Sequence, residues 1–409
     1  MAECNVALYG CGTVGAGVAD MLIGRSGALA ERMGGRVRLK YVVDARKGEV
    51  AAELRPPDHV QVTDDLDGPM RDPEVSVVVE LIGGTGIART VIENALRAGK
   101  DVVTANKALL AECGGELFRL ARARGRSIAF EAAVAGGIPI IAALRNALVG
   151  ERLESIYGIV NGTCNYVLTR MSRDKLSYHE ALSEAQEKGY AEADPTLDVE
   201  GHDTAHKLAV LARLAFGVDV RAADIQCEGI SAIEPADLVY AHGMGYTAKL
   251  LATGIRRGDA VELRVHPTLL RHEHPLASVG GAYNAVCVHG DCVGEVVLTG
   301  LGAGRWPTAS AVVADVCRVA LGTYGADFAA LRQFGNVARA SIVPLAEVRM
   351  RYYFRLSCLD MPGVLARVAG ILGRHAISIS SVIQQDISGG GASGATALEE
   401  EDRVPVVFM

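Results

Sequence analysis

The sequence predicts an α/β protein whose first part, residues 1–135, is a doubly wound parallel sheet. Short β-branched segments alternate there with helical patterns, which is typical of a parallel sheet with helices on both faces. One segment, Val75–Gly84, is apolar almost throughout, as is typical of a strand covered on both faces. The alternation stops after residue 135, so we expect the rest of the chain to form different domains.

The elements of this first domain follow in a regular order. An apolar strand, Asn5–Tyr9, leads into a glycine turn and a helix. Further strands are expected at Val37–Val43, Val75–Gly84, Asp101–Lys107 and Ser127–Val134. Helical patterns cover residues 88–99 and 109–125, between the later strands. The sequence therefore predicts a Rossmann-like sheet.

Two further domains are expected. Residues 136–298 combine helices with strand-like segments at 260–267 and 284–290, which predicts a separate α+β domain. A glycine turn and a helix within residues 299–340 are expected to return to the first domain and pack on its ligand side. Residues 350–409 show strand, turn, helix and strand, then a polar loop at Ser388–Asp402 and a final strand. This pattern predicts a small α+β module.

The composition excludes several classes of function. The 409 residues are half hydrophobic, yet no uncharged apolar stretch approaches the roughly 20 residues of a membrane span. A formal net charge of −7 gives no basic footprint for nucleic acid or for an anionic membrane. Nine cysteines without CxxC spacing, and a start without a secretion leader, favour a cytoplasmic protein. Only Cys164 lies near candidate chemistry, and we expect it to be a buried bystander.

The first glycine turn predicts a dinucleotide site. Gly10, Gly12 and Gly15 form GxGxxG between a strand and a helix, and Thr13 and Val14 complete the motif. The glycines allow a tight turn and a close approach of the backbone, so that a pyrophosphate can lie on the helix N-terminus. We therefore expect this domain to bind NAD or NADP.

The end of the second strand bears on the choice between the two cofactors. Asp44 is placed to accept a hydrogen bond from a ribose 2′-hydroxyl, which favours NAD. Arg46 and Lys47 follow directly and can clamp a 2′-phosphate, which favours NADP. The two interpretations stay open.

Two other segments carry candidate site residues. Thr104 and Lys107 lie where a parallel strand ends, and ligands of such sheets bind beyond the carboxyl ends of the strands. This places Lys107 near the cofactor, and a surface lysine that starts the next helix is the alternative. Glu131 precedes a small-residue turn and an apolar helix. We expect it to cap that turn or, with free carbonyl groups, to hold a hard monovalent cation.

The most unusual segment of the chain is Gly189–Lys207, which has five carboxylates and one lysine directly before an apolar helical run. Read as one helix, Glu200, Asp203 and Lys207 share a face. If that face is desolvated, the charges must pair with each other or with a ligand, which predicts a polar active site. A solvated Asp–Lys pair worth a few tenths of a kcal/mol is the alternative.

Taken together and in order, these motifs resemble homoserine dehydrogenase. The resemblance covers about 340 residues and is most specific in the middle of the chain. It rests on Gly10–Gly15, Val78–Gly84, Thr104–Ala111, Phe130–Ile141, Gly158–Leu168, Gly189–Ala212 and Gly302–Val316. The resemblance implies interconversion of L-homoserine and L-aspartate 4-semialdehyde with NAD or NADP, on the route to threonine, methionine and isoleucine.

The same resemblance implies roles for individual side chains. Lys207 is similar to the proton-donating lysine of the family, and Lys107 to its second active-site lysine. Glu192 and Asp198 are expected to bind the substrate, and Asp203 completes the polar pocket. Glu200 gains no role from the resemblance and is interpreted as an acid at the start of the helix.

The resemblance also implies a sodium ion and further cofactor contacts. The sodium site is formed by Glu131 and the backbone of Val134, Gly136 and Ile138. Thr85 and Gly302 are expected to lie against the nicotinamide. Residues 136–298 become the substrate-binding, catalytic and dimerisation domain, and a homodimer or homotetramer is expected.

The C-terminal module resembles an ACT domain, the small ligand-sensing fold attached to many enzymes of amino-acid synthesis. The family pattern is βαββαβ, whereas this sequence reaches only the third strand, so the module is expected to be incomplete. An exposed strand edge on such a module needs a partner. The resemblance implies threonine as a candidate effector, whereas the incomplete module counts against feedback by threonine.

Two rival functions fit parts of the sequence. A dehydrogenase of another small amino-acid aldehyde or alcohol would keep the glycine turn but has no need of the segment Gly189–Lys207. A non-catalytic amino-acid sensor would explain the C-terminal module but leaves both lysines without a role. An assay of NADH or NADPH oxidation with aspartate semialdehyde separates the three hypotheses.

Overall fold

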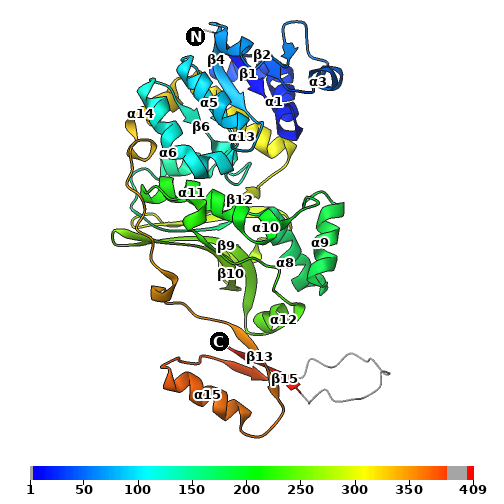
Figure 1. The fold of residues 1–409 in the computed structure, drawn as a ribbon, viewed down its shortest axis with the longest axis vertical. Coiled ribbons are helices and arrows are strands. Elements are labelled where there is room, and N and C mark those ends of the chain that lie inside the picture. The colour runs from blue at the N-terminus through cyan, green and yellow to red at the C-terminus, as the bar shows by residue number, and fades with distance from the viewer. Residues whose placement is uncertain (1–2, 385–402) are drawn as a thin grey trace. The chain divides into compact units, whose positions relative to one another are not determined.

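The structure, a computed structural model, describes residues 3–384 and 403–409 and divides into two compact units, Met1–Val343 and Pro344–Met409. The larger unit contains two six-stranded sheets, and the smaller one contains a three-stranded sheet (Figure 1). The predicted loop Ser388–Asp402 lies outside the described residues.

The first sheet is parallel throughout, with the strand order β3-β2-β1-β4-β5-β6. Its strands are β1 Cys4–Tyr9, β2 Val37–Val43, β3 Gln61–Thr63, β4 Val75–Glu80, β5 Asp101–Thr104 and β6 Ile128–Ala129. The strand order reverses between β1 and β4, and in such sheets ligands bind outside the carboxyl ends of the strands at this point. This confirms the predicted Rossmann-like, doubly wound sheet.

Helices connect these strands. They are α1 Thr13–Gly24, α2 Ser26–Met33, α3 Lys47–Leu54, α4 Gly68–Arg71, α5 Ile87–Arg97 and α6 Lys107–Ala123. The helical patterns at residues 88–99 and 109–125 correspond to α5 and α6. The side chains of Val78 and Val79 are fully buried, as expected for a strand with helices on both faces.

Three strands are shorter in the structure than predicted. β4 ends at Glu80, because Gly83 and Gly84 follow with φ of 79° and 69°. β5 ends at Thr104, and Lys107 is the first residue of α6. The strand expected at Ser127–Val134 is reduced to β6, because residues Glu131–Ala133 form a short 3-10 helix, η1. In each case the backbone turns where the strand reaches the ligand edge of the sheet.

The helix expected to return to the first sheet does so. α13, Arg305–Ala320, packs against α1 and against β4 and β5, and α14, Thr323–Ala330, follows it. The two helices approach closely at Gly17, where a Cβ atom would lie 3.1 Å from Cβ of Ala309. Only glycine permits this approach of α1 and α13.

The second sheet is mixed, with the order β12-β11-β7-β9-β10-β8. Its strands are β7 Leu153–Ile159, β8 Gln226–Cys227, β9 Tyr246–Arg257, β10 Ala260–Arg271, β11 Tyr283–Gly290 and β12 Gly294–Leu301. All neighbouring strands are antiparallel except β8 and β10. The predicted strand segments at 260–267 and 284–290 lie in β10 and β11.

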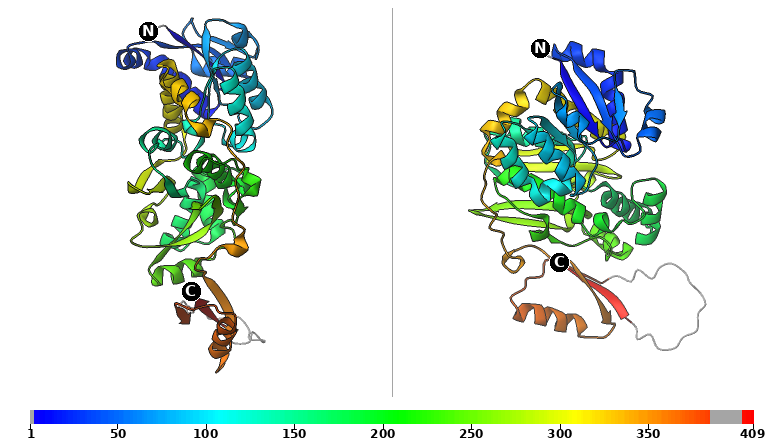
Figure 2. Two further views of the ribbon diagram at one scale, coloured as in Figure 1. Left: turned by 90° about the vertical axis from the view of Figure 1, so that its left-hand side faces the viewer. Right: turned by 45° about the horizontal axis from the view of Figure 1, so that its top comes forward.

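This part of the chain also contains helices, several of which pack on the second sheet. They are α7 Ile140–Ala142, α8 Gly162–Asp174, α9 Tyr178–Glu187, α10 Thr196–Val199, α11 His202–Phe216 and α12 Pro235–Gly243, with a π-helical turn η2 at Ala143–Ala147. α8 and α9 pack side by side, and α11 packs against both α6 and β9 (Figure 2). Through α11, the charged segment thus lies between the two sheets.

The charged segment is not one helix. α10 ends at Val199, with Glu200 as its C-cap, and α11 begins after Gly201, whose φ is 84°. A Cβ atom on Gly201 would lie 2.9 Å from Cγ1 of Val265, so the chain turns tightly here. The prediction that Glu200 shares a helical face with Asp203 and Lys207 is therefore wrong, as is its interpretation as an acid at the start of their helix.

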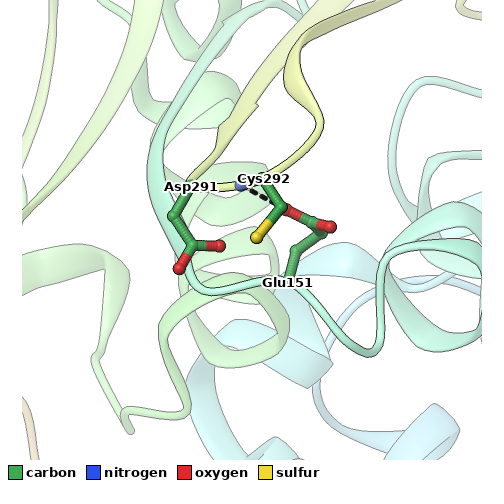
Figure 3. Close-up of side chains that lie close together, drawn as sticks. All are labelled: Glu151, Asp291 and Cys292. Atoms are coloured by element: carbon green, nitrogen blue, oxygen red, sulfur yellow. Dashed lines mark hydrogen bonds between the residues drawn. The ribbon is translucent and has the colours of Figure 1, made fainter.

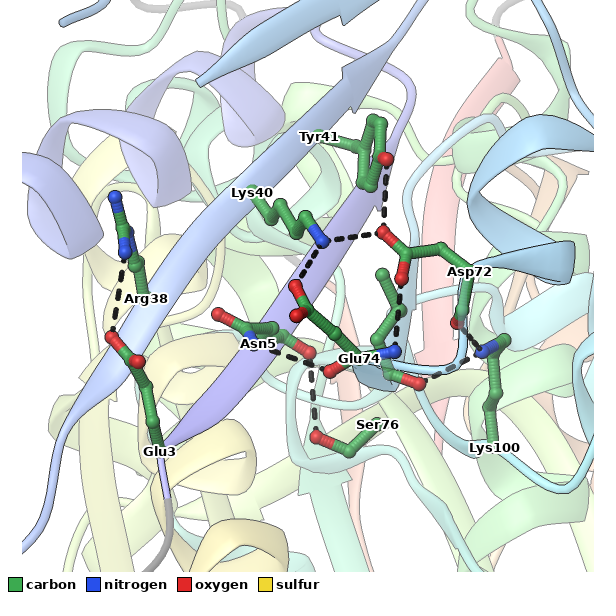
Figure 4. Close-up of polar contacts among 10 residues, drawn as sticks. Glu3, Asn5, Arg38, Lys40, Tyr41, Asp72, Glu74, Ser76 and Lys100 are labelled. Carbon is green, nitrogen blue, oxygen red and sulfur yellow. Dashed lines mark hydrogen bonds and ion pairs between the residues drawn. The ribbon is translucent and has the colours of Figure 1, made fainter. Parts of the chain in front are cut away.

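A polar network lies at the other edge of the first sheet, away from the carboxyl ends of the strands (Figure 4). The Lys40 ammonium pairs with Asp72 at 2.6 Å, and the Tyr41 hydroxyl donates to the same carboxylate at 2.9 Å. The buried Lys100 donates to the backbone carbonyls of Asp72 and Val75. These contacts fix the turn before β4 and take no part in the ligand crevice.

The smaller unit contains β13 Phe354–Leu359, α15 Val364–Arg374, β14 Val382–Gln384 and β15 Arg403–Phe408. The strands are antiparallel in the order β13-β15-β14. The three strands and one helix agree with the predicted order of elements. Within the described part of the chain, no helix is long and apolar enough to cross a membrane.

Candidate active site

The centre of the candidate site is the carboxylate of Asp203, in the first turn of α11. It is 3% exposed. The Lys207 ammonium, one turn later, donates to Asp203 Oδ2 at 2.6 Å and to the Val160 carbonyl at 2.6 Å. The Asp203–Lys207 pair predicted from helical spacing is therefore present, and it is not a solvated surface pair.

Lys107, the first residue of α6, reaches the same carboxylate. Its Nζ lies 3.1 Å from Asp203 Oδ1, and it is placed there by α6, which starts where β5 ends. Burial alone raises the pKa of Asp203, but the charges of Lys207 and Lys107 outweigh it and hold this pKa far below its usual range. Burial lowers the pKa of Lys107, but the Asp203 carboxylate outweighs it and the net pKa is raised. Asp203 and Lys107 are therefore both charged at neutral pH.

A buried amide connects this centre to a second carboxylate. Asn161 Nδ2 donates to Asp203 Oδ2 at 3.0 Å and to Asp198 Oδ1 at 2.7 Å. The Thr163 hydroxyl also lies 3.2 Å from Asp198 Oδ2. Asp198 thus joins Asp203 as predicted, whereas the side chain of Asn161 is a member of the site that the sequence did not indicate.

The other acids and the thiol of this region have different surroundings. Glu192 is exposed, and its carboxylate has no hydrogen bond among the described residues, although its charge helps to raise the pKa of Lys107. The thiol of Cys164 is buried and donates to the Asp198 carbonyl, and burial raises its pKa well above the usual value. Cys164 is thus an unreactive neighbour, as expected.

The glycine turn has the geometry of a phosphate site. Gly10 has φ of 91°, and a Cβ atom there would lie 2.7 Å from the backbone of Leu81. A Cβ atom on Gly15 would lie 2.1 Å from the Gly10 carbonyl, whereas no atom lies within 4 Å of the Cβ position of Gly12. α1 begins at Thr13 without a side-chain cap. The first amides of α1, at Thr13 and Val14, thus face open space, which suits an anion.

Asp44 lies beside this turn. Its carboxylate accepts from the Cys11 amide at 2.8 Å and from the Arg46 amide at 2.9 Å. Burial raises the pKa of Asp44, but these amides and the Arg46 guanidinium outweigh it and lower the net pKa. Arg46 is exposed beside it, whereas the Lys47 ammonium lies 2.8 Å from Asp64. Asp44 and Arg46 are thus brought to the turn, and Lys47 is engaged elsewhere.

A buried carboxylate that the sequence did not indicate shapes the loop after β4. Glu80 is fully buried and accepts from the amides of Ile82 and Gly83 and from the Thr104 hydroxyl. Asn106 caps α6 and donates to the Gly84 carbonyl at 2.7 Å. The side chain of Thr104 is thus enclosed and supports this loop.

Thr85 and Gly302 border the same edge. Thr85 is exposed directly after the two glycines of the β4 loop. At Gly302 a Cβ atom would lie 2.0 Å from the buried amide of Asn284, and a Cβ atom on Gly136 would lie 2.3 Å from the Gly302 carbonyl. The turn at Gly136 and the turn before α13 therefore pack backbone against backbone.

Glu131 is buried under this turn. Its two oxygens accept from the amides of Ile141 and Ala142, each at 2.8 Å, so it caps α7 as one alternative predicted. Burial, and to a lesser extent the nearby Asp315 carboxylate, raises the pKa of Glu131 to about 8. Asp315, on α13, accepts from the Glu131 amide, and burial raises the pKa of Asp315 to about 7.

One group of potential metal ligands lies elsewhere among residues 3–384 and 403–409. Glu151, Asp291 and Cys292 come together at the turn between β11 and β12 (Figure 3). Glu151 accepts from the amides of Cys292 and Val293, each at 3.1 Å, and Asp291 accepts from the Arg152 amide. These acids stabilise a surface turn and are not among the predicted ligands.

The arrangement suits the reduction of a carbonyl group. The carboxyl ends of β1, β4 and β5 form the edge where doubly wound sheets bind nucleotides, and Lys107 begins the helix that follows β5. Two ammonium groups there share one carboxylate, so either can stabilise a developing alkoxide and supply a proton.

Known sequences and structures agree with this interpretation. The homoserine dehydrogenase family matches residues 139–317, its NAD-binding domain matches residues 10–131, and the ACT domain matches residues 352–407. Homoserine dehydrogenase of Neisseria gonorrhoeae is 43% identical over 95% of this chain and 89% of its own length.

Two solved structures are also similar. A homoserine dehydrogenase from Thiobacillus denitrificans has a TM-score of 0.89 and 40% identity, covering 99% of this chain and 90% of its own. A mutant hyperthermophilic archaeal homoserine dehydrogenase in complex with NADPH has a TM-score of 0.66 and 27% identity, covering 78% and 98%. The chain therefore belongs to the homoserine dehydrogenase family of NAD(P)-dependent oxidoreductases.

Proposed function

We propose that this protein interconverts L-aspartate 4-semialdehyde and L-homoserine, on the route to threonine, methionine and isoleucine, with Lys207 as the proton donor. The observation that carries the proposal is the buried Asp203 carboxylate held between Lys207 and Lys107, the residue that begins the helix after β5. The family relationship supports the substrate pair.

Each charged group has a defined task in this reaction. The cofactor supplies the hydride when it is bound. As negative charge builds on the aldehyde oxygen, the Lys207 ammonium stabilises it and then gives up a proton from Nζ. Asp203 keeps this ammonium charged and oriented, because it lies 2.6 Å away and is itself held by Lys107. Lys107 adds positive charge on the cofactor side.

The amino-acid part of the substrate needs partners of both signs. We propose that Glu192 and Asp198 bind its ammonium group. The first turn of α8 offers donors for its carboxylate: Asn161 already accepts from the Cys164 amide, which leaves the amides of Gly162 and Thr163. Glu192 lies on the loop between α9 and α10, so this loop has to bring it to the substrate.

The residues around the glycine turn fit a dinucleotide. Gly10, Gly12, Gly15 and the amides of Thr13 and Val14 would hold the pyrophosphate, and Thr85 and Gly302 would border the nicotinamide. Asp44 favours NAD and Arg46 favours NADP, and the archaeal relative with bound NADPH supports use of the phosphorylated cofactor. Initial rates with NADH and NADPH at equal concentrations decide the preference.

The turn after η1 fits a sodium ion. Glu131 is a buried carboxylate with no ion pair among the described residues, and Val134, Gly136 and Ile138, whose backbone carbonyls are the proposed further ligands, follow it directly in the chain. Oxygen donors of this kind suit a hard cation, whose positive charge would favour the ionised form of Glu131. The unfolding temperature, measured in sodium and in choline salts of equal ionic strength, tests this proposal. A bound sodium ion stabilises the folded protein and therefore raises this temperature.

The larger assembly is also a proposal. Residues 1–135 with 299–340 would bind the cofactor, residues 136–298 would bind the substrate and form a homodimer or homotetramer, and residues 350–409 would sense an effector such as threonine. Half-buried apolar side chains on one face of the second sheet, at Tyr157 and Val297, support a partner there. Sedimentation equilibrium and a threonine titration of the assay test both points. A cytoplasmic location is expected for an enzyme of this route.

The decisive experiment is oxidation of NADPH or NADH with aspartate semialdehyde, followed at 340 nm. Turnover with this aldehyde, and much slower turnover with other small amino-acid aldehydes, is the expected result. Preference for another aldehyde would favour the rival dehydrogenase. Absence of turnover with every aldehyde, together with tight binding of an amino acid, would favour the sensor.

A further inference from the structure

We propose that Asn161 is a positioning residue of this enzyme, whose side-chain amide holds the carboxylates of Asp198 and Asp203 together in the arrangement that Lys107 and Lys207 require. This inference rests on the roles proposed above for Asp198 and Asp203. It adds a group that does not itself touch the reacting atoms.

The geometry assigns a separate task to each end of the amide. Oδ1 accepts from the Cys164 amide at 2.8 Å and caps α8. Nδ2 donates to Asp198 Oδ1 at 2.7 Å and to Asp203 Oδ2 at 3.0 Å. The opposite orientation would set an amide oxygen against two carboxylates and an NH₂ group against the Cys164 N–H, so the contacts themselves fix it.

The two carboxylates need such a bridge. Both lie within hydrogen-bond distance of one nitrogen, Asp203 is 3% exposed, and like charges at this separation repel strongly where water is excluded. Lys207 and Lys107 pair with Asp203, and neither makes an ion pair with Asp198. Asn161 therefore supplies a donor that both carboxylates share, whereas the Thr163 hydroxyl donates to Asp198 alone of the two.

The position of Asn161 in the fold couples three elements. It caps α8 directly after β7, and its bonds reach the last turn of α10 and the first turn of α11. The preceding residue, Val160, accepts from Lys207. The backbone of Val160 thus holds the Lys207 ammonium, and the side chain of the next residue, Asn161, holds both carboxylates.

The variant Asn161→Ser separates the two tasks, because serine caps a helix about as well as asparagine but cannot reach two carboxylates. In the full-length chain, kcat with aspartate semialdehyde is expected to fall about 10- to 100-fold. Losses of this size are typical when a residue that hydrogen-bonds to a metal ligand, and so orients it, is replaced. The KM for the cofactor and the unfolding temperature are expected to stay at wild-type values, because the glycine turn and the cap are intact.

The matched control is Ser177→Ala, which removes the cap of α9 at a distance from the carboxylates. It is expected to lower the unfolding temperature and leave kcat unchanged. Wild-type kcat in a folded Asn161→Ser variant would overturn the inference.

If Asn161→Ser does not fold, Asn161→Asp takes its place, since aspartate is isosteric and also caps but adds a third carboxylate. In the Asn161→Asp background, Asp198→Asn removes one repelling charge, so it is expected to cost less kcat than in the wild type, or to restore some. An equal or larger loss there would count against the inference.

Failure of the proposed function would look different. If Asp203→Asn kept wild-type turnover, the role of Asp203 itself would be wrong, whatever Asn161 does. If Asp203→Asn were inactive and Asn161→Ser fully active, only the positioning role of Asn161 would be lost.

Discussion

Asp203 shows how a single buried charge is made tolerable. Two ammonium groups and one amide donate to its carboxylate, and no water is needed to satisfy it. The lysines are less buried than the acid, with side chains 12% and 36% exposed for Lys207 and Lys107. The acid is therefore the most deeply enclosed group of the three, and the two amines are more accessible.

Replacement of Lys207 by alanine tests the proton donor. We expect kcat to fall by about two to four orders of magnitude, the usual size of a lost general acid, with nearly unchanged cofactor affinity. Steady-state kinetics and cofactor titration measure both quantities. Lys188→Ala is the control, because Lys188 pairs with Glu184 on the surface. Normal turnover in the Lys207 variant would reject the assignment.

The buried side chain of Lys249 predicts how the stability of the protein depends on pH. Lys249 is 3% exposed and donates to Asn165 and to the Val279 carbonyl, and burial lowers its pKa from 10.5 to about 8. Between these two pH values the unfolded chain binds more protons than the folded one, so this group makes stability rise with pH. Below pH 8 the folded protein bears the full cost of the buried charge.

The test compares the wild type with Lys249→Met in urea unfolding between pH 7.5 and 10.5. As the pH rises through this range, the free energy of unfolding of the wild type is expected to increase relative to that of the variant, by at most about 3 kcal/mol. Two parallel pH profiles would show that Lys249 is not the cause.

Among the structural elements, the junction of α10 and α11 decides the geometry of the site. Gly201 turns the chain so that Asp198 ends one helix and Asp203 begins the next. A continuous helix would have placed Glu200 beside Asp203 and moved Asp198 away from Asn161. The turn therefore selects which acids meet.

The substitution Gly201→Ala tests this junction. Gly217, at the other end of α11, has a similar φ of 68° but no atom within 4 Å of its Cβ position, so Gly217→Ala isolates the backbone cost of about 1 kcal/mol. Gly201→Ala also meets Val265 at 2.9 Å and is expected to cost at least about 1 kcal/mol more. Urea unfolding measures both variants. Equal losses of stability would show that Val265 yields freely.

For the molecule as a whole, the proposed site lies within one compact unit. Every proposed catalytic, substrate and cofactor residue belongs to Met1–Val343, and the ACT match belongs to Pro344–Met409. The chemistry and the proposed sensing of an effector are thus carried by different units.

A chain that ends at Val343 tests this division. Its kcat is expected to remain of the same order as that of the full-length chain, since a compact unit with its own core can fold alone. Any effect of threonine seen with the full-length chain is expected to disappear. Rates of the two proteins with and without threonine measure this, and an inactive but folded shorter chain would show that the last unit is needed for catalysis.

Much of this molecule follows from its sequence. The alternation of strands and helices, the glycine turn and the Asp203–Lys207 pair are local patterns, fixed by the periods of strand and helix and by spacing along one helix. Family resemblance also identified Lys107 and Asp198 correctly as neighbours of that pair. These features depend on residues close together in the chain or on motifs that have distinctive order.

Other features were decided only by the tertiary structure. Lys107 and Asp203 come from two helices far apart in the chain, α6 and α11, the Asn161 amide bridges two carboxylates, and Glu80 is buried under the loop after β4. Which side chains meet across the fold depends on how helices and sheets pack. The spacing of residues along one helix or strand does not determine these contacts. The sequence by itself determined which residues could carry the chemistry, and packing decided which of them are buried together and so must share their charges.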